Sequence, residues 1–105
     1  MKLLFVSHPV GPIGDGSGGG VDLTMGNVAK ALTRRGHVIE IIAPVGSRLA
    51  NARVIEVTGT LQPSAQYQDR AAPVSMPANP ILAALWEEAR RRQGAYDVVV
   101  NFAYD

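Results

Sequence analysis

The chain contains no cysteine, and its charges almost cancel: ten basic and nine acidic side chains give 105 residues a formal net charge of +1. The absence of cysteine excludes disulfide bonds and thiolate metal ligands, and it is compatible with a reducing cytoplasm. A net charge this small gives no electrostatic support for nucleic acid or an anionic membrane surface as a partner.

Long apolar runs are also missing. Nowhere does the sequence reach the ~18 consecutive apolar residues that a transmembrane helix requires. The run Leu3–Val6 is too short for a signal peptide and ends at Ser7-His8-Pro9. Metal-ligating residue types do not cluster anywhere, so we expect no metal. We therefore expect a cytoplasmic protein without a membrane span.

Apolar runs predict four strands. Continuous runs at residues 3–6 and 98–100 are typical of strands buried on both faces. The β-branched residues Ile39, Ile41 and Ile42 predict a strand over 38–43, and residues 54–57 predict a weaker strand. Val98–Val100 needs cover on both faces, yet no helix pattern follows it. We therefore expect residues 1–105 to form an incomplete domain, either a fragment or one part of a longer protein.

Helical spacing of apolar residues predicts two helices between these strands. The first runs from Val21 to a terminating Gly36, and the second ends at Gly94. Asn79 and Pro80 predict the second start, as N-cap and first helical residue. The alternation predicts an α/β fold, a Rossmann-like open parallel sheet with helices on both faces. The first loop and the last residues then share the carboxyl edge of the sheet, where such folds bind ligands.

A glycine-rich loop joins the first strand to the first helix. Residues 9–20 contain six glycines, and Gly18, Gly19 and Gly20 are consecutive. Glycine allows a ligand to approach the backbone closely. Free N–H groups at Gly19, Gly20 and Val21, together with the helix dipole, predict a site for phosphate or carboxylate. The alternative is a flexible connector without a ligand.

A nicotinamide dinucleotide is a weaker interpretation of this loop. Gly14-x-Gly16-x-x-Gly19 formally matches the dinucleotide fingerprint, but the loop is too long for the tight turn of that motif. The second strand ends in Ala43-Pro44 rather than in an acid that would bind ribose. No Gly-Lys-Ser/Thr follows, which excludes a P-loop.

Residues 1–44 resemble the opening of a GT-B glycosyltransferase. The resemblance is carried by a strand ending in Ser7-His8-Pro9, by Gly18-Gly19-Gly20-Val21-Asp22, by Leu32-Thr33-Arg34-Arg35-Gly36-His37, and by the strand before Pro44. These segments are similar to the retaining, nucleotide-sugar-dependent enzymes of glycosyltransferase family 4. A narrower similarity covers the whole chain. Val10–Gly14, the triple glycine and residues 100–105 look like the cyanobacterial UDP-glucose:tetrahydrobiopterin glucosyltransferases.

The resemblance implies the N-terminal, acceptor-side half of a two-domain enzyme. The glycine loop, Gly18 to Val21, would reach the diphosphate and sugar of the donor, UDP-glucose. The donor domain would follow in cis and is absent from these residues, so the chain alone should be inactive and no catalytic residue is assigned in it. The family often has a histidine after its fourth strand, whereas this chain has Asn101-Phe102-Ala103-Tyr104-Asp105.

Four polar residues are candidates for the acceptor side of the site. They are His8, Asp22, Asn101 and Asp105, and each has a structural alternative. Asp22 would equally suit a helix dipole, and a lone histidine such as His8 is often structural. Asn101 could bond a sugar hydroxyl but could not carry a proton.

Two other functions remain open. The chain could be a stand-alone module that binds a phosphorylated small molecule without catalysis, or part of a dinucleotide-dependent oxidoreductase. Trp86, His37 and Arg90–Arg92 are interpreted as packing and surface residues. No cofactor is expected, because the nucleotide sugar is a co-substrate. The segment Thr58–Ala78 is expected to select the acceptor.

Overall fold

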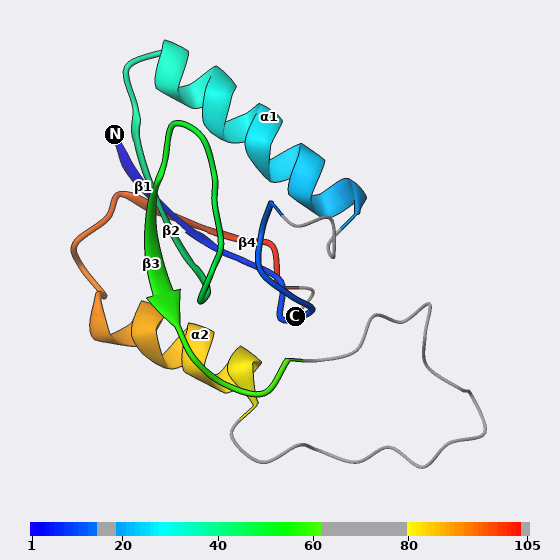
Figure 1. The fold of residues 1–105 in the computed structure, drawn as a ribbon. Coiled ribbons are helices and arrows are strands. Elements are labelled where there is room, and N and C mark those ends of the chain that lie inside the picture. The colour runs from blue at the N-terminus through cyan, green and yellow to red at the C-terminus, as the bar shows by residue number, and fades with distance from the viewer. Residues whose placement is uncertain (15–18, 62–79, 104–105) are drawn as a thin grey trace.

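The computed structural model describes residues 1–14, 19–61 and 80–103, which form a parallel sheet between two helices (Figure 1). The elements are β1 (Lys2–Val6), α1 (Gly20–Arg34), β2 (Val38–Pro44), β3 (Arg53–Val57), α2 (Ile81–Arg91) and β4 (Val98–Asn101). The four strands lie in the order β3-β2-β1-β4, and every neighbouring pair is parallel. The predicted Rossmann-like open sheet is confirmed.

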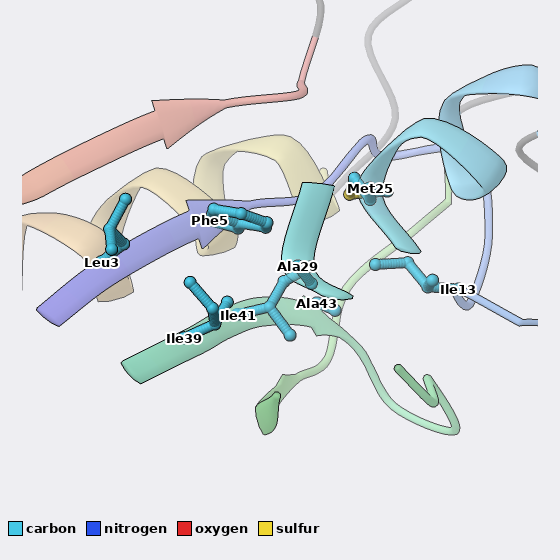
Figure 2. Packing of buried hydrophobic residues seen from close by; sticks show 8 residues of the cluster. All are labelled: Leu3, Phe5, Ile13, Met25, Ala29, Ile39, Ile41 and Ala43. Atoms are coloured by element: carbon cyan, nitrogen blue, oxygen red, sulfur yellow. The ribbon is translucent and has the colours of Figure 1, made fainter. Parts of the chain in front are cut away.

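The two helices cover opposite faces of the sheet because side chains alternate along each strand. Leu3 and Phe5 of β1 pack with Met25 and Ala29 of α1, as Figure 2 shows. Leu4 and Val6 pack on the other face with the side chains of α2 that lie at helical spacing, chiefly Ile81 and Leu85. β1 is therefore buried on both faces, as its continuous apolar run predicts.

Helix α1 ends as predicted. Gly36 follows the last turn with a φ of 87°, a conformation that glycine adopts without a Cβ penalty. The Gly36 N–H donates to the Thr33 carbonyl (3.0 Å), and the His37 N–H donates to the Leu32 carbonyl (3.1 Å). These bonds satisfy carbonyls that the helix end would leave without partners.

The predicted start of α2 is wrong by one residue. Pro80 is the N-cap with extended backbone (φ −61°, ψ 134°), and the helix begins at Ile81. Thr60 explains the shift, because it forms a parallel bridge with Pro80 and its carbonyl accepts the Ile81 N–H at 2.9 Å. Pro80 is thereby held as an extended residue. Asn79 lies outside the described residues.

The prediction that Val98–Val100 is buried on both faces is also wrong. Val98 and Val99 are 40% and 52% exposed, because β4 is an edge strand that pairs only with β1 within the described residues. Only Val100 packs against the cluster beneath α1. The structure describes no helix long and apolar enough to cross a membrane.

Candidate functional site

The chain reverses its direction across the sheet at β1. It moves from β1 outward to β2 and β3, then returns to place β4 on the other side of β1. Val6 and Asn101 are register partners at the carboxyl ends of β1 and β4. The Phe102 N–H donates to the Val6 carbonyl at 2.8 Å. Ligands of open α/β sheets bind at such a switch point, so the residues that follow β1 and β4 form the candidate site.

A hydrogen bond between His8 and Asp22 joins the end of β1 to the first turn of α1. The His8 Nε2 atom lies 2.6 Å from the Asp22 Oδ1 atom. The histidine is fully buried, and the side chain of Asp22 is 13% exposed. Each residue was a separate candidate in the sequence, and the structure brings the two together.

The backbone determines which ring nitrogen of His8 carries the proton. The Val10 N–H, which can only donate, points at His8 Nδ1 from 3.2 Å. Nδ1 is therefore the acceptor, and Nε2 carries the hydrogen that is donated to Asp22. Both ring nitrogens are hydrogen-bonded to atoms of the protein itself. His8 therefore holds Asp22 in place and does not act as a proton carrier.

The first half of the loop is fastened to the neighbouring strand connection. Ile13 is buried in the core beneath α1, where Figure 2 shows it beside Met25. The Ile13 N–H donates to the Ser47 hydroxyl (2.9 Å), and its carbonyl accepts the Arg48 N–H (2.8 Å). Sequence reasoning missed this role of Ser47. A serine three residues after Pro44 is a turn signal, but it does not indicate a partner thirty-four residues away.

Gly14 is the last described residue before the gap in the loop. Its N–H points at the Asp22 Oδ2 atom from 3.3 Å. Its φ is 95°, and an added Cβ would lie 3.0 Å from the Arg48 carbonyl oxygen. Asp22 therefore contacts both the end of β1 and the loop, one through each carboxylate oxygen.

Within the described residues, the amino end of α1 is exposed and uncapped. Gly19 is the N-cap with a φ of 56°, and within the described residues no side chain caps the helix. Gly19 and Gly20 are exposed, and a Cβ added to either meets no atom within 4 Å among the described residues. The first N–H groups of α1 are the type of donors that bind anions. Gly18 lies outside the described residues.

Asn101 lies at the exposed end of β4, opposite Val6. Its side-chain oxygen accepts the Ala103 N–H at 2.7 Å, which turns the chain locally. Asp105 and most of the segment expected to select the acceptor, residues 62–78, lie outside the described residues.

Among the described residues, the groups with shifted pKa values, Tyr96 and Arg92, lie at the other end of the sheet. Burial and the hydrogen bond to Glu40 raise the pKa of Tyr96. The hydrogen bond to Arg92 lowers it and offsets part of this rise. The hydrogen bond to Glu88 is the main reason that the pKa of Arg92 is raised. The neighbouring Asp97 N–H bonds the Lys2 carbonyl at the amino end of β1, so this network is structural and distinct from the candidate site.

No group of three or more metal-ligating side chains occurs within residues 1–14, 19–61 and 80–103. No family model and no curated protein matches the chain.

Proposed function

We propose that this chain is the N-terminal, acceptor-side domain of a retaining, nucleotide-sugar-dependent GT-B glycosyltransferase. In this proposal the enzyme transfers glucose from UDP-glucose to a small acceptor, with tetrahydrobiopterin as the first acceptor to test. The donor domain follows in cis and holds the nucleotide. The chain described here supplies the wall of the cleft that faces it.

The observation that carries the proposal is the exposed pair Gly19 and Gly20 at the amino end of α1, which we call the glycine corner. Gly19 and Gly20 have no Cβ and no neighbour within 4 Å of where one would be, among the described residues. The corner stands beside the carboxyl end of β1 because Asp22, three residues after Gly19, bonds His8. A diphosphate can approach the backbone here and accept N–H bonds from the helix end.

The remaining candidates have supporting roles. Asp22 and His8 hold the corner, and Asn101 stands across the switch point where an acceptor or sugar hydroxyl would pass. None of these side chains is assigned as the catalytic base, because His8 is committed on both ring nitrogens. The chemistry is assigned to groups of the donor domain and to the donor's own leaving diphosphate.

The test uses the protein encoded by the complete open reading frame. UDP release from UDP-glucose is measured with and without tetrahydrobiopterin and a panel of small hydroxyl acceptors. We expect acceptor-dependent UDP release, and the Gly19→Val variant should lose most of it. A reading frame that encodes no second domain, or a complete protein that releases no UDP with any donor sugar, would contradict the proposal.

A second candidate function is a binding module that holds a phosphorylated small molecule without transferring a group. The same glycine corner favours it, since an anion site needs no second domain. Calorimetric titration of the 105-residue chain with UDP, UDP-glucose, inorganic phosphate and NAD(H) distinguishes the candidates. Tight binding of a phosphorylated ligand by this chain alone favours the module, and tight binding of NAD(H) alone favours an oxidoreductase.

The oxidoreductase remains the weakest candidate. β2 ends at a buried Ala43 and Pro44, with no carboxylate to bind a ribose. Glu56 of β3 is the register partner of Ala43, but its Oε2 atom accepts the Gly46 N–H at 2.8 Å.

A further inference from the structure

We infer that Asp22 is a positioning residue, which sets the place of the glycine corner by clamping the end of β1 and the loop to the first turn of α1. The inference rests on the proposed function for its consequence in donor binding. The clamp itself is a property of this chain and is testable without any ligand.

The charge of Asp22 makes its place unexpected. A carboxylate in the first turn of a helix satisfies the positive end of the helix dipole and would repel a diphosphate brought to the same turn. A neutral residue would therefore suit an anion site better, unless the carboxylate is needed to hold the structure together. Both oxygens of Asp22 form such structural contacts, since Oδ1 bonds His8 Nε2 and Oδ2 faces the Gly14 N–H.

The clamp joins three segments at one side chain. His8 follows β1, Gly14 precedes the undescribed part of the loop, and Asp22 belongs to α1. Gly14 is also fixed from the other side, because the adjacent Ile13 is bonded to Ser47 and Arg48. Releasing Asp22 would thus remove the polar link between the first turn of α1 and the segment after β1, while leaving residue 13 and the apolar packing of Val21 and Met25 in place.

His8 gives the clamp a defined proton arrangement. The Val10 N–H bonds Nδ1, so the neutral ring donates through Nε2, and the pair has one donor facing one acceptor. A ring held in this way fixes the direction of the carboxylate, as outer partners do for functional groups in many sites.

The positioning role of Asp22 and its charge predict opposite changes in the affinity for UDP-glucose when Asp22 is replaced by asparagine. Asp22→Asn removes the negative charge but leaves only one oxygen to serve His8 and Gly14. If Asp22 acted through its charge alone, this variant would bind UDP-glucose more tightly. If it positions the corner, the complete protein should bind UDP-glucose about tenfold more weakly, the order expected for one lost hydrogen bond to a charged group.

The experiment combines that affinity with NMR measurements that need no ligand. The ¹⁵N shifts of the His8 ring should show the Nε2–H tautomer in the wild-type protein. The Gly14 N–H, which faces Asp22, should exchange with solvent faster in Asp22→Asn, whereas the N–H groups of β1 should not change. Glu56→Gln, which alters another carboxylate that accepts a loop N–H, is the matched control.

Each outcome decides the inference. The Nε2–H tautomer, faster exchange at Gly14 and weaker donor binding support it. A wild-type Nδ1–H tautomer or cationic ring, unchanged exchange in the variant, or tighter donor binding overturns it. If Asp22→Asn does not fold, the wild-type tautomer decides. If the wild-type protein binds no UDP-glucose, the proposed function fails, and tautomer and exchange still decide the clamp.

Discussion

Tyr96, just before β4, donates its hydroxyl hydrogen to Glu40 in the middle of β2, although fifty-six residues separate the two. Glu40 is 7% exposed, and Arg53 from β3 stands 3.7 Å from its other oxygen. The contact therefore satisfies a nearly buried carboxylate and connects the segment before the edge strand to the centre of the sheet.

This contact predicts a loss of stability at alkaline pH. Burial and the hydrogen bond to Glu40 raise the pKa of Tyr96 above its ordinary value of about 10. The folded state thus favours the neutral phenol, so its contribution is complete below the unfolded pKa and is lost as the pH rises through the folded pKa. The free energy of unfolding, measured by urea titration from pH 8 upward, should fall above about pH 10.

Tyr96→Phe is the variant that checks the cause. It should lower stability at pH 8 by about 1 kcal/mol, the usual value of one hydrogen bond, and should flatten the alkaline decline. A variant with the same decline as the wild-type protein would assign the pH dependence to other groups.

The core beneath α2 should be sensitive to truncation. Leu85 is fully buried between α2 and the sheet, so Leu85→Ala should cost about 2–5 kcal/mol through lost burial and the cavity left behind. Val99→Ala is the matched control on the exposed edge strand, and its effect should stay within about 0.5 kcal/mol. Equal losses in chemical denaturation would show that β4 is covered in solution.

Gly14 should tolerate alanine less well than Gly94 does. Gly14→Ala places a Cβ in a left-handed backbone and 3.0 Å from the Arg48 carbonyl oxygen. Gly94→Ala has nearly the same backbone (φ 89°) but meets nothing within 4 Å in the described part of the chain. Both variants bear the conformational cost of about 1–2 kcal/mol, and only the first bears the clash. Thermal unfolding should therefore place Gly14→Ala below Gly94→Ala, and the reverse order would contradict the described loop.

The sequence predicted the elements well because local patterns determine them. The apolar stripe from Val21 to Leu32 and the glycine at Gly36 are both local signals, and both describe α1 correctly. The exposure of β4 was not predictable, since an apolar run has the same appearance at the edge of a sheet as at its centre. The Pro80 bridge to Thr60 is likewise a tertiary contact that no local signal at residues 79–80 contains.

The candidate site was predictable in part. Parallel topology places the loop after β1 beside the end of β4, and the register of Val6 with Asn101 confirms this. The sequence also marked His8 and Asp22 separately. Their hydrogen bond depends on the path of the intervening loop, which glycines leave open to many conformations, so the pairing had to come from the structure.

The affinity of the complete protein for UDP-glucose, measured for Gly20→Ala against Gly26→Ala, tests the central claim most directly. Both glycines lie within α1, and in the described residues neither has an atom closer than 3.9 Å to an added Cβ, so the fold should accept both changes. Only Gly20 stands at the open corner. We predict that Gly20→Ala weakens binding about tenfold, or 1.4 kcal/mol, while Gly26→Ala does not change it. Equal affinities for the two variants would contradict a donor diphosphate at the amino end of α1.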